Sequence, residues 1–216
     1  MSVLPRHARA DTLIRADSAP RRAADVVVAG AALLVLGPVL LAIGIAVRMT
    51  SPGPALYLQE RVGRGGRPFR LLKFRTMVDG ADRAGALVSG SHDPRVTSVG
   101  ALLRAAHLDE LPQLVNVVRG DMTLIGPRPE VRRYVAFYDP AERAVLDVRP
   151  GLTGPGQLHF AAEQAGALDA VSDPEQYYVT CQLHPKLALD LEYLRHRTFA
   201  RDVALLCRTL AALAGR

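Results

Sequence analysis

The sequence predicts a helix-dominated α+β protein that is monotopic, entering a membrane from one face and returning to it. An uncharged apolar run from Val26 to Val47 predicts a membrane helix. Two strand-like runs around a glycine-rich turn predict a small β-hairpin, and helical patterns fill most of the remaining chain. We expect a mobile tail over residues 1–20, a re-entrant membrane helix over 21–50 and a globular domain over 51–216.

Composition narrows the class of protein. The 216 residues are 49% hydrophobic with a mean hydropathy of +0.11, which predicts a membrane partner. The net charge of +6 comes mainly from arginine, which suits phosphates and anionic headgroups; only Lys73 and Lys186 are lysines. The chain has no tryptophan, so stacking platforms for nucleic acid are lacking. Cys181 and Cys207 show no metal-ligand spacing.

The apolar run carries a break near its middle. At about 1.5 Å per residue, it is about as long as the ~30 Å hydrocarbon core of a bilayer. However, Gly37-Pro38 interrupts it, and a proline inside a helix costs about 3 kcal/mol or kinks the axis. Arginines flank both ends, whereas a spanning helix has one positive side. We therefore expect a re-entrant hairpin of two half-length helices hinged at Gly37 and Pro38.

The β-hairpin is expected from two runs, Ala55–Gln59 and Phe69–Thr76, joined by the basic, glycine-rich segment 61–68. This segment lacks the Lys-Ser/Thr ending of a P-loop, so we interpret it as a surface turn.

Two helices are expected next. Thr97 is placed to cap a helix that runs to His107, and Pro112 favours a helix start that Gly120 ends.

The rest of the chain is expected to be helical with one loop. Residues 130–148 predict a helix interrupted at Asp139-Pro140, and 150–156 predict a loop whose backbone donors could cradle a nucleotide or a diphosphate. From Pro174 the pattern is helical again, with Pro185 separating two pieces. The last helix, 202–213, fits either a membrane interface or ordinary core packing.

The chemistry is concentrated between Leu108 and Glu130. Asp109 and Glu110 are adjacent carboxylates before a helix start, where they could hold a divalent cation such as Mg²⁺, or one could attack phosphorus. The alternative is a helix cap without a chemical role. Arg128 lies between two prolines that fix its backbone, which suits bidentate phosphate binding; an ion pair with Asp121 is the structural alternative.

Four blocks carry a family resemblance: LDELPQLVNVVRGDMTLIGPRPE (108–130), SPGPALYLQERVGRGGRPFRLLKFRTM (51–77), DPRVTSVGALLR (93–104) and VRPGLTG (148–154). Together they resemble the bacterial sugar transferases, the monotopic polyprenyl-phosphate phosphoglycosyltransferases. The resemblance covers nearly the whole chain after Arg21 and implies the same re-entrant helix.

The resemblance implies transfer of a sugar 1-phosphate from a UDP-sugar to undecaprenyl phosphate with release of UMP, initiating surface glycan synthesis. The reaction would occur at the cytoplasmic face of the bacterial inner membrane, where residues 51–216 form the catalytic domain. Asp109 would form a covalent phosphosugar intermediate. The implied partners are the UDP-sugar, the polyprenyl phosphate and membrane lipids, without nucleic acid; a homo-oligomer is left open.

The same resemblance implies the site residues. Asp109 and Glu110 are catalytic and hold Mg²⁺, with Mn²⁺ as an alternative. The residues implied to bind phosphate are Arg104, Arg128, Lys73 and Arg75. Those implied to bind the nucleotide sugar are Asp121, Pro127, Arg149, Thr153 and Gln157.

One segment departs from the family. Many members continue after Gly154 with a W-A-Q-V-x-G-R type sequence, whereas this chain has Pro155-Gly-Gln-Leu-His-Phe-Ala161. A subset replaces that stretch and carries a D-P-E-x-Y-Y segment like 173–178, which indicates a variant of donor specificity. The sequence does not identify the sugar. The rival hypothesis is a non-catalytic, membrane-anchored protein that binds anionic lipids through its arginines.

Overall fold

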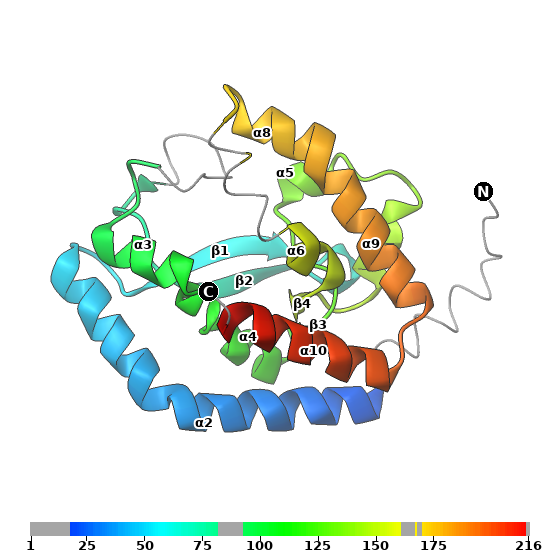
Figure 1. The fold of residues 1–216 in the computed structure, drawn as a ribbon, viewed down its shortest axis with the longest axis horizontal. Helices are drawn as coiled ribbons and strands as arrows, with labels where there is room; N and C mark the ends of the chain where they lie inside the picture. Colours follow the sequence, from blue (N-terminus) through cyan, green and yellow to red (C-terminus); the bar gives the residue numbers. More distant parts are fainter. Residues whose placement is uncertain (1–17, 82–92, 161–166, 168–169, 215–216) are drawn as a thin grey trace.

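The computed structural model describes residues 18–81, 93–160, 167 and 170–214 (Figure 1). Helices dominate, so the predicted α+β class is confirmed in outline. The expected mobile tail lies almost wholly outside the described residues. In chain order the elements are α2 (Ala19–Thr50), β1 (Leu56–Val62), η1 (Arg64–Gly66), β2 (Pro68–Phe74), α3 (Ser98–Ala105), η3 (Leu108–Glu110), α4 (Gln113–Arg119), β3 (Thr123–Ile125), α5 (Arg132–Val135), η4 (Glu142–Asp147), β4 (Gly151–Thr153), α6 (Pro155–Phe160), α8 (Pro174–Tyr177), η5 (Tyr178–Leu183), α9 (His184–Arg195) and α10 (Phe199–Ala214).

The strands form two small sheets. β1 and β2 are antiparallel, with Leu56 opposite Phe74, and this confirms the predicted hairpin. Its turn needs glycine, because Gly65 and Gly66 have φ values of 67° and 73°. β3 and β4 form a short parallel pair, with Thr123 opposite Gly151. This second pair was not predicted, because three-residue strands leave little periodic signal.

Helix α2 is a single bent helix (Figure 1) rather than the predicted hairpin of two helices. Pro38 lies inside it, which accounts for a bend because proline removes a backbone donor and crowds the preceding turn. A Cβ atom at Gly37 would meet nothing within 4 Å, so this glycine is not required for close packing. Length and apolar composition would let α2 cross a membrane.

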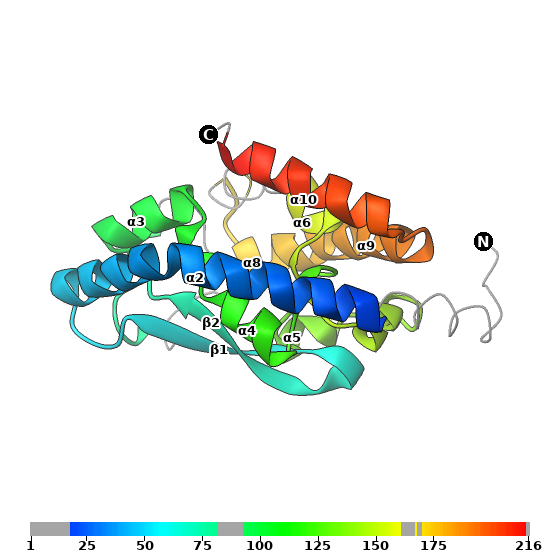
Figure 2. The same ribbon diagram turned by 90° about the horizontal axis from the view of Figure 1, so that it is seen from below.

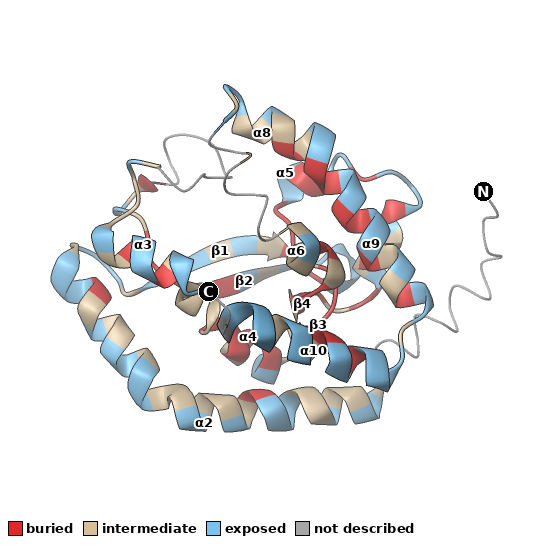
Figure 3. Ribbon diagram, viewed as in Figure 1, coloured by how far each residue is buried: buried red, intermediate tan, exposed pale blue. Residues whose placement is uncertain are grey.

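Helix α2 runs across one face of the body, between α10 and the β-hairpin (Figure 2). One stripe of the helix packs inward: Ala29 and Leu33 join a core cluster with Leu114 and Met122. Elsewhere it is open, and Leu34 is 83% exposed. Figure 3 shows this contrast with the buried residues around α4, β3 and β4. An apolar helix left this open fits contact with lipid.

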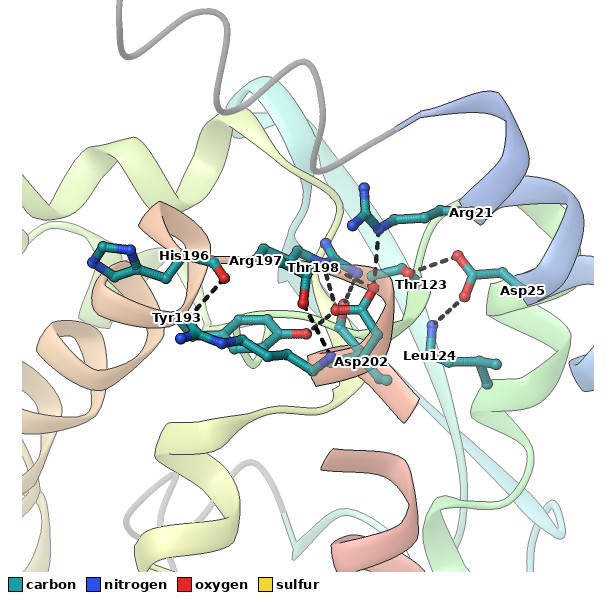
Figure 4. A network of polar contacts seen from close by, with 11 residues as sticks. Arg21, Asp25, Thr123, Leu124, Tyr193, His196, Arg197, Thr198 and Asp202 are labelled. Carbon is teal, nitrogen blue, oxygen red and sulfur yellow. Dashed lines mark hydrogen bonds and ion pairs between the residues drawn. The ribbon is translucent and has the colours of Figure 1, made fainter. Parts of the chain in front are cut away.

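Polar contacts fix the first turns of α2 to the body (Figure 4). Arg21 Nε lies 3.0 Å from Asp202 Oδ2 on α10. Asp25 accepts hydrogen bonds from the Thr123 hydroxyl at 2.6 Å and from the Leu124 N–H at 3.2 Å. Both partners of Asp25 lie on β3, so α2 is attached to the central strands as well as to α10.

Both ends of α2 are attached to the same body. Near its start, Arg22 donates to the carbonyls of Val117 and Val118 at 2.6 and 2.9 Å, which satisfies the C-terminal end of α4. Just after its end, the Ser51 carbonyl accepts a hydrogen bond at 2.8 Å from Arg75, beyond β2. Both ends of this apolar helix therefore contact the globular domain.

Two predicted helical segments differ in the structure. The predicted interruption at Asp139-Pro140 is present, because Asp139 accepts the N–H groups of Ala141 and Glu142 and so favours a turn. The flanking pieces are shorter than predicted: residues 130–148 hold only the four-residue α5 and the 3₁₀ helix η4. Pro185 does not separate two helices. It lies in the first turn of α9, and the π-helical segment Tyr178–Leu183 before it accommodates the missing proline donor.

Candidate active site

Asp109 and Glu110 lie on a tight turn between α3 and α4. The Thr97 hydroxyl accepts the Gly100 N–H at 2.9 Å and begins α3, as predicted. The chain then leaves α3 through His107, a non-glycine residue with a φ of 54°, and forms the 3₁₀ turn Leu108–Glu110. The left-handed residue and the short turn bring both carboxylates ahead of α4. We call Asp109 and Glu110 the acid pair.

Glu110 is held by Arg128. Two guanidinium nitrogens lie 2.5 and 3.2 Å from its two carboxylate oxygens, a bidentate pair. Burial alone would raise the pKa of Glu110, but the charge and hydrogen bonds of Arg128 lower it to about 2. Arg128 is presented from the Pro127–Pro129 segment, as expected. The alternative pairing of Arg128 with Asp121 is wrong.

The carboxylate of Asp109 differs from that of Glu110 in its hydrogen bonding and its pKa. No hydrogen bond from the described residues holds its carboxylate. Burial and the adjacent charge of Glu110 raise its pKa to about 6, although Lys73, Arg104 and Arg128 act in the opposite direction. The acid pair thus contains one carboxylate that Arg128 fixes in its ionised form and one that has a raised pKa and no hydrogen bond from the described residues.

Two further predicted phosphate-binding residues lie at the acid pair. Burial lowers the pKa of Lys73 to about 8, and Glu110 and Asp109 oppose that shift. The Lys73 ammonium lies 5.3 Å from the centroid of the Tyr57 ring. Arg104 donates through Nε to the Thr76 hydroxyl at 2.9 Å, and the charge of Asp109 opposes the lowering of its pKa by burial. Together with Arg128, they form a cationic surround.

The contacts of Arg75 contradict the prediction that it binds phosphate. Its terminal nitrogens donate to the Pro52 carbonyl at 2.5 Å and to the Ser51 carbonyl and hydroxyl at 2.8 Å. The side chain is buried, and a Cβ on Gly53 would come within 2.1 Å of it. Because these donors are used, Arg75 joins β2 to the end of α2 and is not available to a ligand.

The predicted nucleotide-sugar residues are not gathered in one place. Asp121 accepts from the Asn116 amide at 3.1 Å, and Arg149 donates to the Gly120 carbonyl at 2.8 Å. Both therefore lie at the C-terminal end of α4, about one helix length, or roughly 10 Å, from the acid pair. Thr153 bonds to the Thr209 hydroxyl on α10.

Pro127 is next to Arg128 in the chain, and Gln157 lies on α6, which follows β4. The Pro127 carbonyl accepts the Gly151 N–H at 2.8 Å, so the two loops are joined. Gln157 is on α6, and its buried amide oxygen has no hydrogen-bond partner among the described residues. The predicted cradle of free donors over 150–156 is wrong: β4 and α6 occupy the segment, and Gly156 N–H donates to Asp190.

Sequence reasoning missed a buried charged cluster beside Arg128. Glu130 accepts from Arg61 at 3.2 Å and from the Tyr178 hydroxyl, and Arg61 also donates to the Pro129 carbonyl at 3.0 Å. Lys186, with its ammonium 4.7 Å from the Tyr178 ring centroid, lies on the same side. The only sequence signal was Glu130 at the end of the 108–130 block.

The acid pair fits a magnesium ion that completes its coordination with phosphate oxygens and water. Mg²⁺ in proteins commonly takes one or two carboxylates and leaves the remaining positions to substrate and solvent. Burial and the like charge of Glu110 raise the pKa of Asp109, and a divalent cation would relieve the repulsion between the two carboxylates. Across the described ranges, no cluster of three or more His, Cys, Asp or Glu residues could hold a metal without such help.

These features define a class: a protein with a long, exposed apolar helix and, on the attached body, a carboxylate pair surrounded by cations, suited to phosphate-ester chemistry. Comparison with known proteins supports this class. Residues 16–216 match the family described as "Bacterial sugar transferase". The chain belongs to this family and is an enzyme of the sugar-phosphate transferase class.

Individual relatives carry informative names. The UDP-glucose:undecaprenyl-phosphate glucose-1-phosphate transferase of Caulobacter vibrioides is 39% identical over 196 residues, covering 89% of this chain and 69% of that protein. The exopolysaccharide production protein ExoY of Rhizobium meliloti is 35% identical, covering 89% and 84%. An undecaprenyl-phosphate N-acetylgalactosaminephosphotransferase of Aeromonas hydrophila is 40% identical, but the chain spans only 38% of its length.

Proposed function

We propose that this protein transfers a sugar 1-phosphate from a UDP-sugar to undecaprenyl phosphate and releases UMP, starting the synthesis of a surface glycan. The names of its relatives support the acceptor and the reaction type. The observation that carries the chemical step is the asymmetry of the acid pair: Arg128 holds Glu110, whereas Asp109 has no hydrogen bond from the described residues.

In the first half-reaction, an Asp109 oxygen attacks the β-phosphorus of the UDP-sugar. A new bond forms from that oxygen to phosphorus, and the bond from phosphorus to the bridging oxygen breaks. The electron pair leaves with UMP, and the sugar phosphate stays on Asp109. In the second half-reaction, an oxygen of undecaprenyl phosphate attacks the same phosphorus and displaces the Asp109 carboxylate. Two anionic substrates thus use one site in turn.

The surrounding cations bind and orient the phosphates. Arg128, Lys73 and Arg104 face the acid pair and would contact the oxygens of the diphosphate. Asp109 and Glu110 would hold Mg²⁺, or Mn²⁺ in its place. When bound, the metal supplies positive charge that offsets the diphosphate charge beside two carboxylates.

We also propose that α2 enters the membrane from the cytoplasmic face of the bacterial inner membrane and returns. Support comes from Arg21 and Arg22 near its start and from Arg75, which holds the residue after its end. All three contacts are with the same globular body. A helix that crossed the bilayer would lose the contacts at one of its two ends. The contacts therefore favour a bent helix that keeps the acid pair near the lipid phosphate.

The test is UMP release by the purified protein in detergent with undecaprenyl phosphate and a panel of UDP-sugars. Asp109→Asn should lower turnover by at least about three orders of magnitude, since an amide is not a nucleophile here. With a UDP-sugar alone, the intact mass of the wild type should rise by one sugar phosphate, and that of Asp109→Asn should not. A tenth or more of wild-type turnover in this variant would refute the covalent role. No UMP from any donor, with retained binding to anionic vesicles, would favour the rival lipid-binding protein.

A further inference from the structure

Two hydrogen bonds from strand β1 hold the chain just after Arg128. Arg61, near the end of β1, donates through Nη1 to the Pro129 carbonyl at 3.0 Å. The next residue of β1 acts on the next residue of the segment, because the Val62 N–H donates to the Glu130 carbonyl at 2.8 Å. The guanidinium of Arg128 itself lies on the acid pair. The backbone that carries this arginine is therefore bonded to β1 immediately after it.

The chain just before Arg128 is held by strand β4. The Gly126 N–H donates to the Thr153 carbonyl at 2.9 Å, and the Pro127 carbonyl accepts the Gly151 N–H at 2.8 Å. Strands β1 and β4 belong to different sheets. Residues on both flanks of Arg128 are thus fixed by main-chain hydrogen bonds, each flank to a separate part of the fold.

A buried carboxylate and a tyrosine fix the Arg61 guanidinium in turn. The Glu130 carboxylate accepts from Arg61 Nη1 at 3.2 Å and from the Tyr178 hydroxyl. Gln59 Oε1 accepts from Arg61 Nε and Nη2 at 3.2 and 2.8 Å. Burial and the charge of Glu130 raise the pKa of Tyr178, so its hydroxyl keeps the proton and donates it to the carboxylate. We call Arg61, Glu130 and Tyr178 the clamp.

The buried ion pair in the clamp has a cost that packing alone does not require. Burial lowers the pKa of Arg61, and the charge of Glu130 opposes that shift. A buried ion pair is weak evidence for stability, because apolar side chains of similar volume avoid the cost of desolvation. Apolar side chains would, however, leave the Pro129 carbonyl without its donor. The ion pair therefore provides a fixed direction for the bond to the Arg128 segment.

We propose that the clamp positions Arg128 for the transfer reaction, by fixing the backbone after it so that its guanidinium stays on Glu110 and faces the donor phosphates. Tyr178 is the last residue of the D-P-E-x-Y-Y segment, 173–178. Through Tyr178, this segment acts on the phosphate-binding arginine and not on the sugar. This inference rests on the proposed function, and the clamp residues are positioning residues without contact to substrate.

The test is a double-mutant cycle on kcat/KM for UMP release, with Tyr178→Phe and Arg128→Ala made singly and together. Tyr178→Phe removes one hydroxyl and keeps the ring, whose centroid lies 5.0 Å from that of Tyr134 and 4.7 Å from the Lys186 ammonium. We expect a loss of about fivefold to tenfold in the wild type, since the hydrogen bond is to a charged group. In the Arg128→Ala background the loss should be less than about twofold. An equal loss in both backgrounds, or no loss in the wild type, would overturn the proposal.

Two further readouts separate positioning of Arg128 from general loosening of the fold. Tyr178→Phe should weaken the binding of UDP and leave unchanged the binding of uridine, which has no phosphate. Equal weakening of both would indicate a structural role and overturn the proposal. The loss of kcat/KM should also be the same factor for every UDP-sugar that the wild type accepts. Factors that differ between donors would mean that the 173–178 segment reads the sugar, which would overturn the assignment to Arg128.

The matched control is Tyr177→Phe, in the neighbouring tyrosine of the same segment. The Tyr177 hydroxyl makes no hydrogen bond with the described residues, so its loss should leave kcat/KM and the affinity for UDP unchanged. Arg61→Lys is the second clamp variant, because lysine keeps the charge beside Glu130 but lacks the planar fork. It should show the same non-additivity with Arg128→Ala. If Tyr178→Phe and Arg61→Lys both fail to fold while Tyr177→Phe folds, the clamp serves stability and the proposal is overturned.

Failure of the proposed function remains distinguishable. If the wild type releases no UMP from any donor, the same cycle is measured as affinity for UDP in the presence of Mg²⁺. Non-additive losses of affinity would then support the positioning role by themselves. Additive losses, or no binding of UDP by the wild type, would overturn it.

Discussion

Arg128 donates to both carboxylate oxygens of Glu110, at 2.5 and 3.2 Å, and leaves the neighbouring Asp109 without a comparable partner among the described residues. Two adjacent acids of nearly identical chemistry are thereby made different. The pKa of Glu110 is lowered to about 2, whereas that of Asp109 is raised to about 6. Environment, rather than residue type, separates the roles in the proposed reaction.

The first prediction concerns Arg128. Arg128→Ala removes a bidentate, charge-assisted contact and should lower kcat/KM for the UDP-sugar by about tenfold to over a hundredfold. Arg128→Lys should recover only part, because a point charge does not reproduce the planar fork. Arg133→Ala is the control, since this arginine is 65% exposed and pairs with Glu175, away from the acid pair. Wild-type kinetics in both Arg128 variants would reassign the residue to structure.

The second prediction concerns pH. Asp109 attacks as a carboxylate, and its pKa is raised to about 6, so the reactive form is lost as pH falls through that value. We expect kcat/KM to fall roughly tenfold per pH unit below about 6 and to level off above it. Glu110→Gln removes a neighbouring negative charge that raises the pKa of Asp109. The acid limb of the pH profile, meaning the fall of kcat/KM at low pH, should therefore move to lower pH.

Measurement of kcat/KM between pH 5 and 8 at fixed Mg²⁺ checks this prediction. Glu192→Gln is the control, because this acid is 60% exposed on α9 and should leave the limb in place. A flat profile in the wild type, or a limb that moves upward in Glu110→Gln, would contradict the assigned electrostatics.

The sequence predicted local features where one residue decides the conformation. Thr97 caps α3, and Gly120, with a φ of 96°, ends α4, as glycine after a helix should. The rigid presentation of Arg128 by Pro127 and Pro129 stays a prediction, whereas the structure shows that its guanidinium pairs with Glu110. The prolines and glycines could not reveal the partner of Arg128. Glu110 is distant in sequence and meets Arg128 only through the fold.

The predictions that failed concern side chains whose surroundings are set by segments far from them along the chain. Lys73 and Arg75 are two residues apart and would share a face of a continuous strand, but β2 ends at Phe74, so Arg75 turns toward Ser51. Asp190 escaped notice because an acid on a helix is usually exposed at the surface, as Glu192 is on the same helix. Its burial depends on close backbone approach at Gly154 and Gly156, which are far from it along the chain.

The third prediction concerns the metal. A diphosphate beside two carboxylates brings more negative charge than Arg128, Lys73 and Arg104 comfortably offset, so UMP release should need Mg²⁺ or Mn²⁺. We expect activity to vanish with EDTA and to return when either ion is added in excess. A melting curve recorded with EDTA controls for unfolding. Full activity after exhaustive chelation would exclude a metal at the acid pair.

The last prediction concerns the topology of α2. With Cys181 and Cys207 changed to serine, single cysteines at the exposed Ala19 and Arg67 should both be labelled only from the cytoplasmic side. Arg67 is preferred to the turn glycines, because Gly65 and Gly66 have positive φ values that strain any other residue. Labelling of the two sites from opposite sides would establish a spanning helix.

Pro38 supplies the internal test of that topology. Pro38→Leu removes a penalty of about 3 kcal/mol for a straight helix and adds apolar surface. A straighter α2 cannot keep both Arg21 on Asp202 and Ser51 on Arg75, so we expect lower turnover and loss of cytoplasmic labelling at position 19. Gly37→Ala is the matched control: its Cβ meets nothing within 4 Å, and Pro38 remains, so topology and activity should be retained. If Pro38→Leu also retained both, the bend would have to come from packing of α2 against α4 and α10 rather than from the proline.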